Sequence, residues 1–392
     1  MELFDRLQAL PAARPLLERL ADVARVYVVG GGVRDLLLGG QPVDLDLVVE
    51  GDAADVAKRL GGSIVVHDRF GTSTVKLDGF TYDIARARTE TYSSPGALPD
   101  VRPASLEEDL KRRDFTVNAI AISLNGTVIA FPGALEDLDA RQLRILHDQS
   151  FFDDPTRLLR LARYASRLGF EVEPHTLELV GAAGRADALE TVSGPRVGAE
   201  LRLLSREPDP VAAFETLREL GLDAAIEPGF GLIDPELARR ALGELPADGR
   251  RDLLVLAAAA RGLRRPAELL DRLGFEARDR EVIVSAARDA EGLAQALSAA
   301  SRPSEIAAAA ARAAPEQVAL AAALGASEPA RDWLERLRHV RLEIDGGDLL
   351  RAGVPEGPAI GRGLRAALDA KLDGLVKGRE GELRTALEAS RD

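Results

Sequence analysis

The spacing of apolar residues changes near residue 138, and this change limits the folds that are open to the chain. Before it, short β-rich runs alternate with glycine-containing turns, a pattern typical of a sheet. The runs are Val26 to Val29, Leu45 to Val49, Ser63 to His67, Thr74 to Leu77, Phe80 to Ala85, Ala119 to Leu124 and Thr127 to Ile129, with a helical segment at Ala53 to Leu60. After it, Ala, Leu, Arg and Glu recur at helical spacing. We therefore predict an α+β protein with a small α/β head followed only by helices.

The length of the chain predicts several parts within this scheme. Its 392 residues exceed one ordinary domain. Proline-bearing breaks divide the second part into short helices, with no repeat period. We predict a head over residues 1–137, a helical neck over 138–206, a helical body over 207–300 and a helical tail over 301–392.

Composition excludes several kinds of site and location. The chain has no cysteine, which excludes disulfides, thiolate metal sites and cysteine nucleophiles, and its four histidines are scattered. A catalytic metal would therefore need oxygen ligands. No apolar run approaches the roughly 20 residues of a membrane helix, and charged residues interrupt the apolar positions near the N-terminus, unlike a signal peptide. We expect no membrane partner and a cytoplasmic location.

A glycine-rich turn is followed closely by two aspartates. Gly30 to Gly32 come directly after a predicted strand, and their backbone N–H groups can cradle a triphosphate. Asp44 and Asp46 open the next strand two positions apart, so both carboxylates lie on one face. Such a pair suits Mg²⁺, and Asp83 on a neighbouring strand is the candidate third ligand. In the plainer alternative, the glycines only form a turn and the aspartates are edge residues.

A basic cluster precedes a later strand. Lys111, Arg112 and Arg113 can meet a phosphate or a ribose, and Asn118 offers both a donor and an acceptor. The alternative is a charge run that water solvates.

A predicted amphipathic helix begins near Asp154. One face is apolar and the other carries a stripe of arginines, Arg157, Arg160, Arg163 and Arg167. Cytosine and adenine both present an amine donor beside an unprotonated ring nitrogen, and a carboxylate next to a guanidinium complements that pattern. Asp154 and Arg157 could therefore select C and A. As the alternative, Asp154 followed by Pro155 is a good helix cap.

These segments resemble the motifs of the class II tRNA nucleotidyltransferase and bacterial poly(A) polymerase superfamily. Residues 30–39 follow its GGxVRDxLLG pattern, Asp44 and Asp46 its DxD pair, and residues 112–119 its complete RRDFTxNA motif. The segment from Phe151 to Phe170 resembles its nucleotide-selecting motif, with Asp153 where Glu is common. The resemblance covers residues 26–170, and a weaker one covers the tail segment 348–361.

The resemblance implies a nucleotidyltransferase head and template-independent transfer from CTP and ATP to the 3′ end of tRNA, with Mg²⁺ as cofactor. The product would be CCA or its terminal A, with release of pyrophosphate. The expected catalytic residues are Asp44, Asp46 and Asp83, of which Asp44 and Asp46 bind the metal. The expected nucleotide-binding residues are Gly30, Gly31, Arg34, Arg112, Arg113, Asp114, Asn118, Asp154, Arg157, Arg160 and Arg163.

Two segments bear on which nucleotides the enzyme adds. The family's DxxxG hinge corresponds to Ala130 to Ala134, which lacks both the Asp and the final Gly, and this weakens the case for switching from C to A. The flexible loop near Thr89 to Ala104 has full length, whereas family members that add only CC lack much of it. We expect addition of A to tRNA ending in CC, and leave addition of the full CCA open.

Two other functions compete with this interpretation. A bacterial poly(A) polymerase shares the head and neck but tends to carry a basic C-terminal extension, which the end of this chain does not resemble. A non-catalytic RNA-binding protein would not need the aspartates together with a complete RRDFTxNA motif. The net charge of −13 opposes a nucleic-acid partner, although the local potential decides binding. The sequence does not indicate an oligomeric state.

Overall fold

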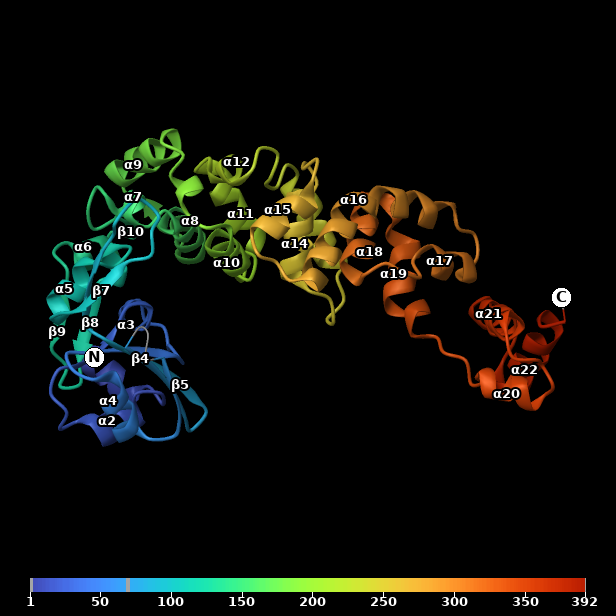
Figure 1. Cartoon of the computed structure of the whole chain (residues 1–392), viewed down its shortest axis with the longest axis horizontal. Coiled ribbons are helices and arrows are strands. Elements are labelled where there is room, and N and C mark those ends of the chain that lie inside the picture. The colour runs from blue at the N-terminus through green and yellow to red at the C-terminus, as the bar shows by residue number, and fades with distance from the viewer. Residues whose placement is uncertain (1–2, 68–70, 392) are drawn as a thin grey trace. The chain divides into compact units, whose positions relative to one another are not determined.

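The computed structural model describes residues 3–67 and 71–391, and the chain divides into two compact units (Figure 1). Unit 1 comprises Met1–Glu200 with Leu220–Ala225, and unit 2 comprises Leu201–Glu219 with Ile226–Asp392. The expected α+β class is confirmed, because unit 1 contains a mixed sheet and unit 2 is built from helices.

A seven-stranded sheet forms the centre of unit 1. Its strands in spatial order are β3 (Ser63–His67), β4 (Thr72–Leu77), β5 (Phe80–Arg86), β2 (Leu45–Val49), β1 (Val26–Val29), β8 (Ile120–Ser123) and β9 (Val128–Ala130). β2 and β5 run parallel, and the other neighbours run antiparallel. All seven predicted strands are confirmed: three have the predicted bounds, and the ends of the other four are shifted by one or two residues.

Burial alternates along β4 and β5, as expected of strands that have one buried face. In β2, Leu45 and Leu47 are buried whereas Asp46 between them is exposed. Helix α4 (Ala53–Leu60) begins at Asp52, whose carboxylate accepts a hydrogen bond from the Ala54 N–H at 2.8 Å. Its apolar stripe packs on strands β2 to β5, and α2 (Arg14–Leu20) lies beside it (Figure 1).

The remaining helices of unit 1 come before, between and after the strands. Val29, Val48 and Ala121 of the sheet pack with Ala119 and Leu110 in one buried cluster. The helices are α1 (Leu3–Ala9), α3 (Gly31–Leu37), α5 (Leu106–Lys111), α6 (Ala134–Asp139), α7 (Ser150–Asp153), α8 (Thr156–Leu168), α9 (Pro174–Arg185) and α10 (Gly194–Leu204), with 3-10 turns at Thr116–Asn118 and Ala188–Thr191. The boundary of unit 1 falls within α10.

Two short sheets correct the sequence-based expectation. The segment expected to be a flexible loop contains an antiparallel hairpin of β6 (Arg88–Thr91) and β7 (Asp100–Pro103). In the region expected to be wholly helical, β10 (Gln142–Leu143) pairs in parallel with β11 (Glu171–Val172). The strands of both pairs are only two to four residues long, so local periodicity carries little signal for them.

Unit 2 contains the remaining helices except α12 (Leu222–Ile226), which belongs to unit 1 as far as Ala225. They are α11 (Pro210–Glu219), α13 (Pro235–Glu244), α14 (Arg251–Ala260), α15 (Pro266–Arg272), α16 (Ala277–Ala299), α17 (Pro303–Ala309), α18 (Pro315–Ala321), α19 (Ser327–Glu335), α20 (Gly346–Arg351), α21 (Pro358–Leu372) and α22 (Gly378–Ala389). Of the predicted proline breaks, Pro210, Pro266 and Pro303 begin helices, where the missing proline N–H leaves no helix hydrogen bond unmade, whereas Pro228 and Pro246 lie between helices. α14 is buried along most of its length and contacts α13, α16 and α18.

The last helices of unit 2 share a small core of their own. Ile344, Leu349, Val354, Ala367 and Ala386 form a buried cluster where α20, α21 and α22 meet. Close packing of α21 on α22 depends on one glycine of α21: a Cβ added there would lie 2.6 Å from the Ala386 carbonyl oxygen.

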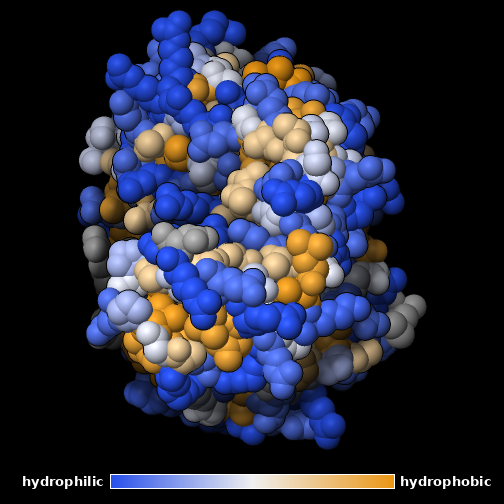
Figure 2. Space-filling model, turned by 90° about the vertical axis from the view of Figure 1, so that its right-hand side faces the viewer, coloured by the Kyte–Doolittle hydropathy of each residue, from blue (hydrophilic) through white to orange (hydrophobic). Residues whose placement is uncertain are grey.

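The face of the molecule drawn in Figure 2 is mostly polar. Figure 2 shows hydrophilic residues over most of one face, with hydrophobic residues in small groups between them. The most exposed large apolar side chains, Leu375, Ile233 and Leu98, come from separate parts of the chain. Among the described residues, no helix combines the length and the apolar character that a membrane span requires.

We predict that Gly363→Ala destabilises the full chain, because the new methyl group would overlap the Ala386 carbonyl. Overpacking of this kind costs about 1–3 kcal/mol. Gly361→Ala in the same helix is the matched control, since nothing lies within 4 Å of its Cβ position and alanine favours helix by about 1 kcal/mol. Urea denaturation followed by circular dichroism measures both. Equal free energies of unfolding for the two variants would contradict this packing.

Candidate active site

The glycine turn connects β1 to α3. Gly30 has φ +69° and ψ −137°, a conformation that L side chains rarely adopt. A Cβ on Gly30 would also lie 3.0 Å from Nη1 of Arg113. The turn therefore needs glycine for its backbone angles and for the close approach of an arginine from another motif.

Arg34 is the most buried arginine of the motifs, with 2% of its surface exposed. Its Nη1 donates to Oδ1 of Asn118 at 2.6 Å, and its Nη2 donates to Asp35 at 2.7 Å. The guanidinium also lies 5.4 Å from the centre of the Tyr164 ring. Arg34 thus joins α3 to the turn Thr116–Asn118, behind the cavity described below.

Three carboxylates lie near the start of β2. Asp46 is the register partner of Asp83 on the parallel strand β5, and Asp44 immediately precedes β2 on the exposed side. The Asp83 carboxylate accepts a hydrogen bond from the Thr74 hydroxyl at 2.6 Å. Loss of hydration raises the pKa of Asp46, and the like charges of Asp83 and Asp44 raise it further.

This donor set has the chemistry that a hard divalent cation requires. All three groups offer oxygen, and a cation among them would relieve the repulsion that Asp46 experiences. Within the residues that the structure describes, no three His, Cys, Asp or Glu side chains already converge closely enough to hold a metal ion. Side-chain rotation would therefore have to bring the oxygens together.

The Arg-Arg-Asp segment follows α5, whose first turn is capped by the Ser105 hydroxyl. Asp114 is 5% exposed and accepts hydrogen bonds from the Phe115 N–H at 2.8 Å and the Asn118 amide at 3.0 Å. Its other oxygen lies 2.6 Å from Nη2 of Arg160. Burial opposes its ionisation, but these partners outweigh burial and lower the pKa of Asp114. Asp114 is therefore a charged anchor for Arg160.

Asp154 combines the two roles that the sequence left open. Its Oδ1 accepts from the Thr156 N–H at 3.1 Å and the Thr156 hydroxyl at 2.6 Å, as a helix cap does. The same oxygen accepts from Nη2 of Arg196 at 2.8 Å, and Arg196 also donates to the Gly96 carbonyl. Asp154 nevertheless lines the cavity, so capping does not remove it from a ligand's reach.

The arginines of α8 occupy different environments. Arg157 is buried and donates to the Ser150 hydroxyl at 2.6 Å and to the Arg112 carbonyl at 2.7 Å. The charge of Asp114 raises the pKa of Arg160. Arg163 stacks over Tyr164 at 4.7 Å from the ring centre and lies 3.8 Å from Glu200. The predicted stripe is therefore packed within unit 1, except for the exposed Arg167.

One cavity of about 450 Å³ in unit 1 brings the motifs together. Ten of the predicted site residues line it: Gly30, Gly31, Asp46, Arg112, Arg113, Asp114, Asn118, Asp154, Arg157 and Arg160. Asp44, Asp83, Arg34 and Arg163 do not line it. Asp83 adjoins Asp46 in the sheet, and Arg34 and Arg163 flank the Tyr164 ring, so these residues support the walls.

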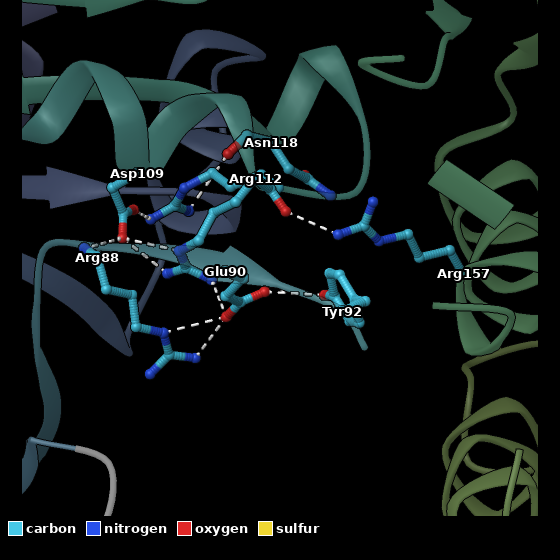
Figure 3. A network of polar contacts seen from close by, with 8 residues as sticks. Arg88, Glu90, Tyr92, Asp109, Arg112, Asn118 and Arg157 are labelled. Carbon is cyan, nitrogen blue, oxygen red and sulfur yellow. Dashed lines mark hydrogen bonds and ion pairs between the residues drawn. The ribbon is translucent and has the colours of Figure 1, made fainter. Parts of the chain in front are cut away.

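Sequence reasoning missed five residues of the cavity lining. They are Arg88, Glu90, Tyr92, Pro99 and Tyr164. Three of them stand two apart along the hairpin, which is the spacing of one face of a strand. Figure 3 shows Arg88, Glu90 and Tyr92 side by side, with Glu90 meeting Arg112. These three side chains are charged or polar, so their alternation lacks the apolar residues that predict a strand.

Unit 2 contains a larger cavity of about 850 Å³ with a different character. Four arginines and four carboxylates line it: Arg202, Arg206, Arg250, Arg278, Asp248, Glu276, Asp279 and Glu316. The charges balance, and Arg206 and Arg250 both pair with Asp252. None of the sequence motifs of the head contributes to this cavity.

Comparison with known proteins agrees with the site. Residues 26–144 match the poly A polymerase head domain. An A-adding tRNA nucleotidyltransferase of Geobacter sulfurreducens is 42% identical over 56% of this chain, which spans only 27% of that relative's length. A CC-adding tRNA nucleotidyltransferase of Deinococcus radiodurans is 34% identical over 95% of this chain and 91% of its own. The chain belongs to the tRNA nucleotidyltransferase family.

A solved structure extends the likeness of this nucleotidyltransferase to nearly the whole chain. The Thermotoga maritima CCA-adding enzyme complexed with tRNA is 29% identical and superposes with a TM-score of 0.76, over 99% of this chain and 98% of that one. Nucleotidyltransferases of this family generally use divalent metal ions, which suits the oxygen donors near β2.

Proposed function

We propose that the chain is a tRNA nucleotidyltransferase that adds the 3′-terminal CCA, or its final A, from CTP and ATP, with release of pyrophosphate. One observation carries the proposal: a single cavity is lined by the glycine turn, the Arg-Arg-Asp segment and the start of α8. Arginines and backbone N–H groups suit a triphosphate, and the Asp154–Arg157 pair suits a base. Such a reaction places the enzyme with its tRNA substrate in the cytoplasm.

We propose Mg²⁺ as the cation, held by Asp44 and Asp46 with Asp83 as the candidate third ligand. When bound, it would polarise the reacting phosphate and favour ionisation of the tRNA 3′ hydroxyl to its alkoxide. The chain's own residues bind and orient the nucleotide. Arg113 approaches the glycine turn, and Arg160 is fixed by Asp114, so both guanidiniums are preorganised for phosphate or ribose.

Base selection is proposed for the wall formed by the start of α8. Cytosine and adenine each place an amine donor next to a ring acceptor, which a carboxylate and a guanidinium complement. Uracil and guanine would oppose a carbonyl to Asp154 and a ring N–H to Arg157, and unmatched polar groups in a confined site are costly. Arg196 supports this wall, because it holds Asp154 and the Gly96 carbonyl together.

The same proposal assigns a role to each part of the chain. The head (1–137) would carry catalysis, the neck (138–206) base recognition, and the body (207–300) and tail (301–392) contacts to tRNA. For the neck, support comes from Asp154 and Arg157 in the cavity lining. For the tail, it comes from Arg362 and Arg365, which are exposed on α21 just after Gly357.

We predict that the purified chain adds AMP to tRNA ending in CC. The hairpin β6–β7 supports this, because its Tyr92 and Pro99 line the cavity. The segment at the family's hinge position gives less support for addition of the full CCA. Ala130 lies within β9 and Ala134 begins α6, so both ends of the segment belong to regular elements. To test this, the chain is incubated with tRNA transcripts that end before the first C, after C and after CC, each with ATP, CTP or both. Gel electrophoresis then measures the length of each product.

The products distinguish the specialisations. Extension of the CC-ending transcript alone identifies an A-adding enzyme, and extension of all three to CCA identifies the complete one. Long homopolymer tails would favour a poly(A) polymerase. Addition of C residues without A at the CC end would contradict the prediction and point to a CC-adding enzyme.

Asp46→Ala should lower nucleotide incorporation by about 100-fold or more, because metal-assisted charge stabilisation is worth several kcal/mol. Asp55→Ala is the matched control, since Asp55 pairs with Lys58 on the exposed side of α4 and does not line the cavity. Single-turnover extension of tRNA with Mg²⁺ measures both, and filter binding checks that tRNA affinity is retained. An Asp46→Ala variant with a tenth of wild-type turnover would refute the catalytic role of Asp46.

Asp154→Asn should relax discrimination against UTP and GTP while costing little stability. The amide oxygen can still accept from Thr156 as a cap, but the carboxylate that faces the base is lost. Asp154→Ala should relax selection too and also destabilise the fold by about 1 kcal/mol through loss of the cap. Incorporation ratios of the four nucleotides, with melting curves, separate the effects. If the incorporation ratios of the four nucleotides are unchanged in both variants, Asp154 acts as a helix cap and does not select the base.

A further inference from the structure

Three arginines of the cavity wall are compensated by two carboxylates outside the family motifs quoted above. Arg88, Arg112 and Arg113 are the cations, and Glu90 and Asp109 are the anions (Figure 3). The cluster therefore keeps one net positive charge. Guanidiniums in a confined space repel one another unless carboxylates separate them, so the anions decide where the cations stand.

Asp109 forms the inner half of the cluster and is fully buried. Its Oδ1 accepts two charge-assisted hydrogen bonds from Arg112, from Nε at 3.0 Å and from Nη2 at 2.7 Å. Its Oδ2 accepts from Nη2 of Arg113 at 3.0 Å, and the Arg88 N–H also reaches Asp109 at 3.2 Å. One carboxylate thus fixes both arginines of the Arg-Arg-Asp segment.

Glu90 forms the outer half and comes from a different element, strand β6. Its Oε1 accepts from Nη1 of Arg112 at 2.9 Å and from Nε and Nη2 of Arg88 at 3.0 and 2.9 Å. Its Oε2 accepts from the Tyr92 hydroxyl at 3.0 Å. Burial, and next the charge of Glu90, raise the pKa of Tyr92, so the hydroxyl remains a donor. Only 8% of the Glu90 side chain is exposed.

Together the two carboxylates hold every nitrogen of the Arg112 guanidinium. Asp109 takes Nε and Nη2, and Glu90 takes Nη1. The Arg112 side chain is therefore fixed in orientation before any ligand arrives, which lowers the entropy cost of binding. Arg157 donates to the backbone carbonyl of Arg112 and not to its side chain. The orientation of the Arg112 guanidinium therefore does not determine the position of Arg157 in the base-selecting wall.

We propose that Glu90 is a positioning residue for the triphosphate, acting through Arg112. The proposal rests on the proposed function, because it assigns the triphosphate to this part of the cavity. It also assigns a role to the hairpin β6–β7, which ties Arg112 to an element outside the Arg-Arg-Asp segment. Since every nucleoside triphosphate shares the same phosphates, Glu90 affects all of them equally and does not affect base choice.

The test is equilibrium binding of ATP, CTP and inorganic tripolyphosphate to the full chain, measured by titration calorimetry in EDTA. Glu90→Gln keeps the shape but removes the charge that holds Arg112 and Arg88. A charge-assisted hydrogen bond to a preorganised group accounts for about a tenfold change in affinity. We expect the Kd of all three ligands to rise about 10-fold, by the same factor.

Glu108→Gln is the matched control. Glu108 pairs with Lys111 at 2.6 Å on the exposed side of the same α5 helix whose end carries Arg112, and it does not line the cavity. Its variant should bind the three ligands as the wild type does. If Glu90→Gln fails to fold by circular dichroism, Glu90→Asp replaces it: the charge is kept but the side chain is one methylene shorter. We then expect a common rise of about 3-fold.

Folded Glu90 variants with unchanged affinity for tripolyphosphate would overturn the proposal. A rise for ATP alone would do the same, because it would give Glu90 a role in base choice. The proposed function fails separately: a wild-type chain that binds all three ligands yet extends no tRNA end would contradict tRNA nucleotidyl transfer and leave the role of Glu90 standing. A wild-type chain that binds none of the three would contradict both.

Discussion

Compensation of arginine charge is the constraint on which the cavity of unit 1 depends. Five arginines line it, and each is held in place by a carboxylate or by another oxygen. Asp109 and Glu90 hold the Arg-Arg pair, Asp114 holds Arg160, and a hydroxyl and a carbonyl hold Arg157. These partners come from the hairpin, α5 and the segments around α8, so the charge network also fixes how those elements meet.

This arrangement separates three tasks within one cavity. The glycine turn and the Arg-Arg segment form the part suited to phosphates, and the start of α8 forms the part suited to a base. Asp46 of β2 lines the same cavity, and its register partner Asp83 lies beside it on β5. Because the supporting side chains are buried or tied by several hydrogen bonds, the phosphate and base parts of the cavity are largely preorganised, which favours binding.

Much of this could be predicted from sequence, for physical reasons. Strands such as β1 and β2 carry strong alternation or β-branched runs, so their positions were accessible. The motif residues were found because glycine, aspartate and arginine stand at fixed spacings along short segments. The hairpin β6–β7 was missed because its strands contain many charged residues, whose burial depends on partners elsewhere in the chain. Glu90 could not be paired with Arg112 from sequence, since the two residues are 22 positions apart.

The alternatives that the sequence left open were not exclusive. Asp154 is a helix cap and a cavity residue at once, because one carboxylate oxygen serves Thr156 and Arg196 while the residue still faces the cavity. Similarly, Arg163 belongs to the predicted arginine stripe, yet it packs on Tyr164 and supports the wall. Function and local structure draw here on the same side chains.

In the proposed function one cavity serves both CTP and ATP, through a shared phosphate site and a shared base site. Competition binding measures this sharing: CTP, UTP or GTP displaces labelled ATP from the full chain while the fluorescence anisotropy of the label is followed. We expect one site per chain, full displacement by CTP and displacement by UTP or GTP only at much higher concentration. Independent sites for ATP and CTP, or equal displacement by all four nucleotides, would contradict this expectation.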